Sequence, residues 1–401
     1  MSTVIFRKGL DLKDAVAATL AKDYHSAIVD DLIGHGFRRV RGRLTIHLAR
    51  EFGFCYGVDR AVDYAYQTRK RFPDRTVYLT GEIIHNPHVN DNLRAAGIRF
   101  LSDAGEPREP LGAQAVIILP AFGVTVHALA AYDRLGCTLV DTTCGSVLNV
   151  WKNVKRYAQD GYTALIHGKV RHEETLATAS QVLKYPGGRY LVVLNRDQAS
   201  RVCSYIERGG DRDAFLAEFR DMASEGFDPD RDLRHIGLAN QTTMLMSESL
   251  NIGEMFRQAM CARFGEAALG DHFRAFDTIC TATQDRQDAV ETLLDRETLD
   301  LMIVVGGYNS SNTRNLAKIC AARLQTYHVA DADALRSASE IRHRLIDAPS
   351  GGAGQEVAGS GWLPAAGTVR IGLTAGASTP NNIIGQVVQR LERFAAVADG
   401  A

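Results

Sequence analysis

The sequence lacks several patterns that mark common binding sites and cellular locations. It has no Cys-x-x-Cys pair, so zinc ribbons, thioredoxin-type sites and ferredoxin-type cluster loops lack their signature. It has no Walker loop and no Gly-x-Gly-x-x-Gly, which leaves ATP or dinucleotide binding by those routes unsupported. No apolar run approaches the roughly 18 residues of a membrane span, and the charged N-terminal stretch lacks the apolar core of a signal peptide. We therefore expect a cytoplasmic protein that does not contact a membrane.

The chain also lacks an excess of either charge. Its 46 Lys and Arg residues face 47 Asp and Glu residues, for a net charge of −1, which argues against a broad basic surface for nucleic acid. The one basic cluster, FRRVRGR at 37–43, is typical of a solvated surface. An anionic small substrate is still possible, but a local site must hold it. At roughly 150 residues per domain, 401 residues allow two or three domains.

A strand-like run that ends in a cysteine and is followed by a helical pattern occurs three times. The runs are LTIHLAREFGFCYG, CTLVDTTCG and FRAFDTIC, and they end in Cys55, Cys144 and Cys280. Apolar residues at helical spacing follow each cysteine. Each set continues with a second strand, loop and helix, which brings His85, His172 or the NSSN segment about 30 residues after the cysteine.

A third strand unit completes each set, at 116–125, 235–244 and 369–380. Alternating strands and helices are typical of parallel sheets covered by helices, so nine such units predict three similar α/β domains. Ligands of parallel sheets bind beyond the carboxyl ends of the strands, where all these polar loops are expected. The predicted boundaries are an N-terminal extension at 1–43 and domains at 44–141, 142–277 and 278–401. We also predict an inserted helix with flexible flanks near 207–233 and a Gly-rich surface loop at 349–361.

The three cysteines are candidate metal ligands. Each precedes a helix, where the helix dipole favours the thiolate that binds metals. A buried cysteine is often only a small hydrophobic residue, and this interpretation fits the other four cysteines better: Cys137, Cys203, Cys261 and Cys320. Three thiolates suit either a zinc ion with a bound water or a [4Fe–4S] cluster with one open iron. Thiolate chemistry alone does not choose between them.

Further candidates follow the strands. In RHEET, Glu174 could act as a general acid, although a glutamate in the first turn of a helix is the commoner explanation. His172 and His85 could bind an anion or simply cap a helix. Hydroxyl and amide groups before predicted helices can cradle a phosphate or form a capping turn. These groups are Thr242, Thr243, Ser310, Ser311, Asn312 and Ser378.

With these motifs, the chain resembles the 4-hydroxy-3-methylbut-2-enyl diphosphate reductase family, also called LytB or IspH. The resemblance runs from about residue 44 to 395. It rests on GFCYGVDRAV, GEIIHNPHV, DTTC, HGKVRHEETLATAS, NQTTM, TICTATQDRQDA, GGYNSSNT and TAGASTP in this order. The N-terminal extension, the PAFG segment and the insert resemble the longer form known from cyanobacteria and plastids.

The resemblance implies a pseudo-threefold trefoil of three α/β domains around an oxygen-sensitive [4Fe–4S] cluster. The family removes the allylic hydroxyl of its substrate with two electrons and protons. This is the last step of the methylerythritol phosphate route, and it yields isopentenyl and dimethylallyl diphosphates. By motif match, Cys55, Cys144 and Cys280 would hold the cluster. A ferredoxin or flavodoxin is the expected electron donor.

The resemblance also implies roles for the other candidates. Glu174 would deliver the proton, and Thr242 or Thr243 would orient the substrate hydroxyl. The diphosphate would be held by His85, His172, Ser310, Ser311, Asn312 and Ser378. Neutral donors and helix N-termini can hold a diphosphate without a basic patch, which agrees with the near-zero net charge.

Two positions depart from the family pattern. Phe122, in PAFG, stands where the short bacterial form has a histidine, so one phosphate contact is lost or replaced, although the long form also carries phenylalanine. Gly145 follows Cys144 where the family usually has proline, so the ligand loop is expected to be looser. Two other functions stay open: a zinc hydrolase using the same three cysteines with Glu174 as base, and an iron–sulfur sensor, for which no output module is evident.

Overall fold

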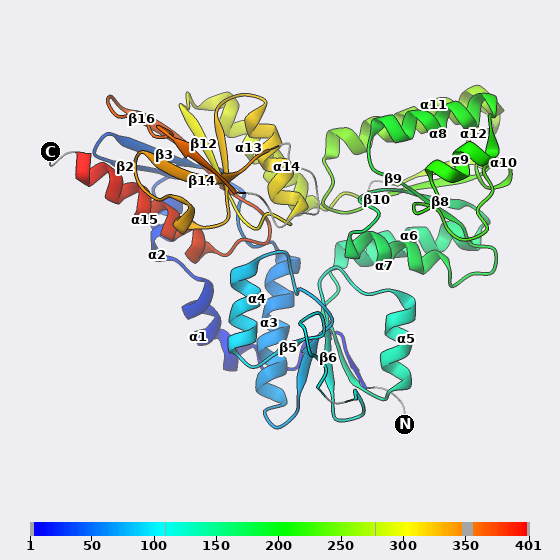
Figure 1. Ribbon diagram of the computed structural model, residues 1–401, viewed down its shortest axis with the longest axis horizontal. Helices are drawn as coiled ribbons and strands as arrows, with labels where there is room; N and C mark the ends of the chain where they lie inside the picture. The colour runs from blue at the N-terminus through cyan, green and yellow to red at the C-terminus, as the bar shows by residue number, and fades with distance from the viewer. Residues whose placement is uncertain (1–3, 109, 277, 347–355, 399–401) are drawn as a thin grey trace. The chain divides into compact units, whose positions relative to one another are not determined.

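The computed structural model describes residues 4–108, 110–276, 278–346 and 356–398 (Figure 1). The chain divides into two compact units. The first comprises Met1–Ile5 and Glu109–Cys280, and the second comprises Phe6–Arg108 and Thr281–Ala401. Strand β1 (Ile5–Phe6) falls on the division. Among the described residues, no helix is long and apolar enough to cross a membrane.

The first unit alternates strands and helices along the chain. Its strands are β6 (Val116–Leu119), β7 (Thr138–Asp141), β8 (Thr163–His167), β9 (Tyr190–Val193), β10 (Ile236–Asn240) and β11 (Phe273–Ala275). Its helices are α5 (Val126–Arg134), α6 (Gly145–Gln159), α7 (Glu173–Val182), α8 (Arg196–Arg208), α9 (Arg212–Glu218), α10 (Pro229–Asp232), α11 (Met246–Phe264), η1 (Glu266–Ala268) and α12 (Leu269–His272). β6 and β7 pair in parallel, and four strands form a wholly parallel sheet in the order β11-β10-β8-β9.

Side chains of the four-stranded sheet alternate between two apolar cores. Leu165 packs with residues of α8 and α11 on one face, whereas Ala164 and Ile166 pack with residues of α6 and α7 on the other. Figure 1 shows these helix pairs on opposite sides of the sheet. Because both faces are covered, the central strands β8 and β10 are apolar in the middle and carry polar residues at their ends, as expected of parallel sheets.

The second unit contains a larger mixed sheet. The strands of this unit are β2 (Arg38–Arg41), β3 (Leu44–Leu48), β4 (Val77–Leu79), β5 (Arg99–Phe100), β12 (Leu301–Val305), β13 (Thr326–Val329), β14 (Glu340–Arg344), β15 (Glu356–Ser360) and β16 (Val369–Ala375). Its helices are α1 (Lys13–Tyr24), α2 (Ala27–Gly34), α3 (Tyr56–Arg71), α4 (Pro87–Ala95), α13 (Thr281–Arg296), α14 (Ser311–Ala321), η2 (Ala332–Ala334) and α15 (Asn381–Ala398). β4 and β5 pair in parallel.

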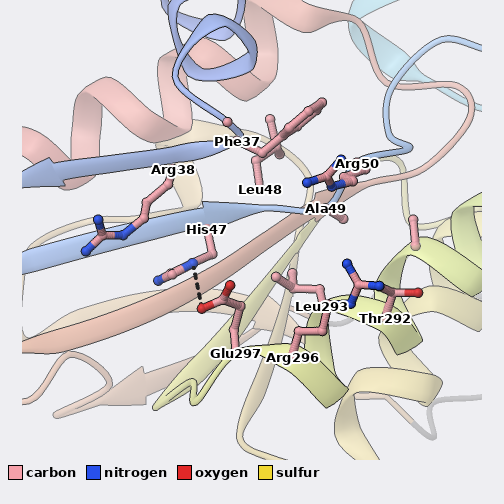
Figure 2. A pocket seen from close by; sticks show the side chains of 12 residues that line it. Phe37, Arg38, His47, Leu48, Ala49, Arg50, Thr292, Leu293, Arg296 and Glu297 are labelled. Carbon is pink, nitrogen blue, oxygen red and sulfur yellow. Dashed lines mark ion pairs between the residues drawn. The ribbon is translucent and has the colours of Figure 1, made fainter.

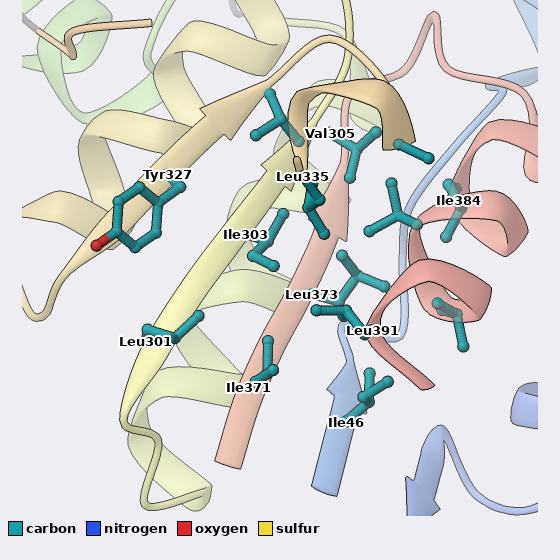
Figure 3. Packing of buried hydrophobic residues seen from close by; sticks show 14 of the residues in the cluster. Ile46, Leu301, Ile303, Val305, Tyr327, Leu335, Ile371, Leu373, Ile384 and Leu391 are labelled. Atoms are coloured by element: carbon teal, nitrogen blue, oxygen red, sulfur yellow. The ribbon is translucent and has the colours of Figure 1, made fainter. Parts of the chain in front are cut away.

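The seven-stranded sheet has the order β15-β14-β13-β12-β16-β3-β2, with a parallel centre and antiparallel edges. Its residues also alternate between two cores. Ile303 and Val305 pack with α15 (Figure 3), whereas Met302 and Val304 pack with residues of α13 and α14. The sheet is therefore a helix-covered platform whose strand ends carry several of the predicted site residues.

The predicted α/β fold with small parallel sheets is confirmed, and each of the nine predicted strand units is a strand followed by a helix. The three-domain division and its boundaries stay a prediction. The insert near 207–233 forms two short helices, α9 and α10, rather than one, and Phe215, Phe219 and Phe227 anchor it in the core of the first unit.

The prediction of a surface loop at 349–361 is partly wrong. Residues 349–355 lie outside the described residues, but the five residues of β15 pair with β14 in antiparallel register. Ladder hydrogen bonds override the Gly-rich composition there. The extension at 1–43 contributes α1, which packs against α3, and the exposed strand β2, which carries the basic cluster.

Candidate functional site

Each of the three candidate cysteines stands at the start of a helix. Cys55 is the N-cap of α3, Cys144 is the N-cap of α6, and Cys280 directly precedes α13. All three are half-buried. A thiolate at such a position gains from the helix dipole and from the free N–H groups of the first turn. The predicted placement before a helix is therefore confirmed for all three cysteines, and their role as ligands stays a prediction.

Within the first unit, Cys280 lies beside the N-terminus of the helix that Cys144 caps. The hydroxyl of Ser146, in the first turn of α6, lies 3.3 Å from the sulfur of Cys280 and donates to it. The backbone N–H of Cys144 donates to Ala121 in the PAFG segment at 3.0 Å. Two of the three candidate ligands therefore meet at one helix N-terminus.

The segment that delivers Cys144 is shaped by its own aspartate. Asp141 accepts hydrogen bonds from the N–H of Thr143 at 3.0 Å and from its hydroxyl at 2.6 Å, and such local bonds stabilise a turn. Thr142 bonds back to Leu119 through both its N–H and its hydroxyl. The matching aspartate before Cys280, Asp277, lies outside the described residues.

Glu174 is connected to the Cys280 segment through Thr242. Its side chain is 1% exposed. One carboxyl oxygen accepts from the N–H of Thr242 at 2.6 Å and the other from the Thr242 hydroxyl at 3.0 Å. The carbonyl of Thr242 in turn accepts from the N–H of Cys280 at 3.3 Å. A first-turn glutamate that served only the helix dipole would face solvent, so this burial favours the functional interpretation over the commoner one.

Gln241 organises the loop around Glu174, a role that the sequence did not reveal. Its side-chain oxygen accepts from the N–H of Lys169 at 3.1 Å and from the hydroxyl of Thr175 at 3.3 Å. Its amide nitrogen donates to the hydroxyl of Thr243 at 2.9 Å. Gln241 thereby joins the HGKVRHEET and NQTTM segments. Its position within the NQTTM motif was the one sequence feature that could have pointed to this role.

His172 caps α7 and faces Phe122. Its Nδ1 atom accepts from the N–H of Glu174 at 3.2 Å, so in the neutral ring the proton resides on Nε2, which is then a donor. The ring of Phe122 lies edge-to-face against it, with centroids 5.6 Å apart. Phe122 therefore orients the histidine through packing, where the short bacterial form has a second imidazole.

In the second unit, Cys55 and Asn312 meet at one residue of the TAGASTP segment. The N–H of Cys55 donates to the carbonyl of Ala377 at 3.1 Å, and the N–H of Ala377 donates to the side-chain oxygen of Asn312 at 2.9 Å. The amide nitrogen of Asn312 is buried and has no hydrogen-bond partner among the described residues. This buried amide group is therefore available to donate to a bound anion.

The remaining predicted anion ligands gather around the same segment. Ser310 caps α14 and accepts from the N–H of Thr313. Ser378 donates to the carbonyl of His85 at 3.2 Å, and His85 bonds Glu82 through Nδ1 at 2.7 Å. A Cβ atom on Gly307 would lie 2.4 Å from that carbonyl, so this close approach requires glycine. Ser311 is buried in the first turn of α14.

Arg286 is a second residue that sequence reasoning missed. Its side chain is 4% exposed, and its guanidinium donates to the carbonyls of Phe52, Gly53 and Phe54 at 2.8 to 3.4 Å. These three residues directly precede Cys55. Charge-assisted bonds from a planar guanidinium fix geometry as well as position, so Arg286 holds the loop that presents the Cys55 thiol.

The other cysteines are consistent with a packing role, with one exception. Cys137, Cys203 and Cys320 are buried, and burial raises the pKa of both Cys203 and Cys320 to about 12. Cys261 is only half-buried, and its thiol donates to Glu266 at 2.9 Å, which raises its pKa. Its assignment as a simple core residue is therefore wrong, because the end of α11 is exposed to solvent.

Each unit thus assembles part of the predicted site. The first unit joins Cys144, Cys280, Glu174 and Thr242, with His172 next to Glu174. The second unit joins Cys55, His85, Asn312 and Ser378 around Ala377. The convergence of all three thiols on one cluster stays a prediction. Fold and site together define an α/β protein with half-buried thiols, a buried carboxyl group and helix N-termini beyond the ends of parallel strands.

Comparison with known proteins identifies the family. The family model described as "LytB protein" matches residues 46–392. A curated relative from Gloeobacter violaceus is 47% identical, with 98% of this chain and 93% of the relative covered. Another, from a Picosynechococcus species, is 44% identical over 96% of this chain and 93% of its own length. Both are named 4-hydroxy-3-methylbut-2-enyl diphosphate reductase. The chain belongs to the LytB family.

Solved structures agree in fold. A structure of (E)-4-hydroxy-3-methyl-but-2-enyl diphosphate reductase is 26% identical and aligns with a TM-score of 0.51, covering 87% of this chain and 99% of its own. A structure of the E-1-hydroxy-2-methyl-but-2-enyl-4-diphosphate reductase from Plasmodium falciparum aligns with a TM-score of 0.59, covering 86% of each chain. Its 22% identity supports the fold alone.

Proposed function

We propose that the protein reduces (E)-4-hydroxy-3-methylbut-2-enyl diphosphate to isopentenyl and dimethylallyl diphosphates. In this reaction the allylic C–O bond breaks, a C–H bond forms, and two electrons and two protons are consumed as water leaves. The observation that carries the proposal is the connection from Glu174 through Thr242 to Cys280, because it joins a buried proton donor to a candidate cluster ligand. The names of the relatives support the same reaction.

The residues present suit a [4Fe–4S] cluster held by Cys55, Cys144 and Cys280. Three half-buried thiols at helix starts form the donor set, and the helix dipoles stabilise their anionic forms. Such a cluster, with one iron free of protein ligands, supplies electrons and a Lewis acid for the substrate hydroxyl. We propose a ferredoxin or flavodoxin as the external electron donor.

Glu174 and Thr242 handle the proton and the hydroxyl. A protonated Glu174 can deliver its proton to the leaving oxygen, as a general acid does. The Thr242 hydroxyl, bonded to the same carboxyl group, would orient that oxygen, with Thr243 beside it. Because Glu174 is buried, bulk water does not compete for this proton.

The diphosphate would be held by neutral donors. Asn312 offers its buried amide nitrogen, Ser310 and Ser311 stand at the N-terminus of α14, and Ser378 follows β16. Helix N-termini are favourable places for phosphate groups. His85 and His172 would add imidazole donors. Holding the diphosphate fixes the reacting carbon in place and lowers the entropic cost of reaction.

The test is metal and sulfide analysis of protein purified without oxygen, followed by turnover. We expect about four iron and four acid-labile sulfide ions per chain, as a [4Fe–4S] centre requires. We also expect conversion of the allylic diphosphate with a low-potential reductant. Stoichiometric zinc without sulfide would contradict the proposal and support the zinc hydrolase instead. An intact cluster that leaves the substrate unchanged would contradict the substrate assignment alone.

A further inference from the structure

A basic pocket lies in the second unit, away from the candidate site. It encloses about 220 Å³ and is lined by β2, the end of β3 and the last turns of α13 (Figure 2). Drug-sized ligands generally occupy pockets of about 300 Å³ or more, so this one suits a small ion. Thr292, in its wall, comes 11 residues after the start of α13, roughly 16 Å along the helix axis. The pocket is therefore separate from the end of α13 that adjoins Cys280.

Three arginines from three separate segments line this pocket. Arg38 comes from β2, Arg50 from the loop after β3, and Arg296 from the last turn of α13. In the part of the chain that the structure describes, none of the three is paired with a carboxylate. Other arginines of this unit are paired, such as Arg370 with Asp300 and Arg390 with Asp333. Figure 2 shows the guanidinium groups of Arg50 and Arg296 near each other at the hollow, whereas that of Arg38 points away from them. The unpaired groups of Arg50 and Arg296 leave the hollow positive.

Backbone and ring contacts hold this arrangement. Phe37 has a φ of 64°, in the left-handed region that residues with a Cβ atom avoid. Two hydrogen bonds keep it there: its N–H donates to Leu32 at 2.8 Å, and its carbonyl accepts from Leu48 at 2.9 Å. The guanidinium of Arg50 lies 5.5 Å from the centre of the Phe37 ring, which orients the cation at the rim. Such conformations concentrate at functional positions.

The one acidic residue that lines the pocket, Glu297, contacts a histidine rather than an arginine. Glu297 lies 3.4 Å from Nδ1 of His47, as the dashed line in Figure 2 shows. His47 is Arg38's partner across the β2–β3 ladder, and burial lowers its pKa, which keeps the imidazole neutral near pH 7. Three arginines against one glutamate leave a net charge of +2 in the lining.

We propose that this pocket binds a small oxyanion of two or more negative charges, of the phosphate or diphosphate type. Guanidinium groups bind phosphate oxygens through paired hydrogen bonds, and those of Arg50 and Arg296, from separate elements, can hold one such ion. The bound anion would tie the loop after β3 to the C-terminal turns of α13. It would act as an effector or stabilising ion, distinct from the substrate.

The test is calorimetric titration of the full chain with inorganic diphosphate at constant ionic strength. The proposed substrate site also holds a diphosphate, so the titration is made in the background Asn312→Ala/Ser378→Ala. We expect binding to persist in that background and to weaken about a hundredfold with Arg50→Gln/Arg296→Gln, since each lost charged contact costs about tenfold. Arg323→Gln, an exposed arginine that pairs with Asp295, is the matched control.

A gain of affinity separates a binding role from a folding defect. Glu297→Gln removes the one repulsive charge and should tighten binding several-fold, which a misfolded variant would not do. The proposal is overturned if diphosphate no longer binds in the Asn312→Ala/Ser378→Ala background, because all binding then belongs to the substrate site. It is equally overturned if the arginine variants bind like the parent, or if chloride at the same ionic strength competes equally.

Discussion

The carboxyl group of Glu174 is buried, and both of its oxygens accept hydrogen bonds from Thr242. Replacing Glu174 with Gln keeps the shape and one acceptor oxygen but removes the acidic proton. We expect kcat to fall by about 10²- to 10⁴-fold, the usual contribution of a general acid. Iron content and the melting temperature should stay close to those of the parent. The measurement is anaerobic turnover with a chemical reductant.

The neighbouring glutamate provides the matched control for Glu174. The side chain of Glu173 is 59% exposed, so Glu173→Gln makes the same change of charge one residue away without touching Thr242. It should retain most of the activity. Near-normal turnover by Glu174→Gln would show that another group supplies the proton.

Gly145 offers a test of stability rather than chemistry. It is the first residue of α6, a position that favours proline. Cys144 before it has φ −62° and ψ 143°, the conformation that a following proline requires. A Cβ atom at position 145 would meet nothing within 4 Å. Gly145→Pro should therefore raise the free energy of unfolding by about 0.5–1 kcal/mol, measured by urea denaturation.

Gly145→Ala separates the two contributions to that gain. Alanine removes the flexibility of glycine but does not fix φ, so it should recover only part of the stabilisation. The backbone around Cys144 already has the geometry that the family's usual proline imposes. A destabilised Gly145→Pro variant would show that the N–H of residue 145 is needed where it is.

At the scale of elements, the loop before Cys55 depends on a residue of α13. Arg286 donates to three consecutive carbonyls of that loop, and lysine cannot reproduce this planar arrangement. We expect Arg286→Lys to keep the overall fold but to loosen residues 52–55. Hydrogen exchange of this segment should rise in the metal-free protein, and alkylation of the Cys55 thiol should become faster by about tenfold, since each lost charged contact is worth about that much.

A surface arginine controls for the change of side chain. Arg323→Lys alters an exposed residue of the same unit that pairs with Asp295 and should leave exchange of residues 52–55 unchanged. If Arg286→Lys behaves the same way, the loop is held by the backbone alone. The left-handed conformation of Gly53, which has a φ of 67°, would then be the main determinant of the turn.

The same elements show what sequence can and cannot predict. The runs that form β8, β12 and β16 are mostly apolar and each is followed directly by glycine, so strand and site position follow from composition. The role of Arg286 does not follow, because its carbonyl partners lie more than 230 residues away in the chain. One signal was present: Arg286 falls on the buried face of α13 with Thr283 and Val290, where an arginine requires partners.

Glu174 shows the same limit. Its residue type and its position at a helix start could be predicted, whereas its burial could not. Burial depends on the pairing of β8 with β10, which brings the NQTTM segment to the start of α7. Pairing partners of parallel strands are separated by crossover helices, so local sequence does not specify them.

At the scale of the whole molecule, each unit contains one deeply buried histidine. His167 belongs to the first unit and His328 to the second, and burial lowers the pKa of each to about 4. In the unfolded chain a histidine has a pKa of about 6.5. Between these values the unfolded state binds a proton that the folded state excludes. The stability that each buried neutral histidine contributes is therefore fully present above about pH 6.5 and is lost as the pH falls toward 4.

The size of this effect follows from the two pKa values. At pH 5 each histidine should cost about 2 kcal/mol relative to pH 8. The two tryptophans allow each unit to be followed by itself, since Trp151 lies in the first unit and Trp362 in the second. Urea unfolding of the metal-free chain, observed by fluorescence of the variants Trp362→Phe and Trp151→Phe, should show both units losing stability between pH 8 and pH 5.

Single substitutions then assign the pH dependence to one histidine at a time. His167→Gln should flatten the profile reported by Trp151 and leave that of Trp362 unchanged, and His328→Gln should do the reverse. The exposed His35 is the control, because His35→Gln changes a histidine that the unfolded and folded states both leave in water. Equal effects of His167→Gln on both profiles would mean that the units unfold as one cooperative body. Flat profiles in the parent would mean that water enters both cores and solvates the protonated imidazoles.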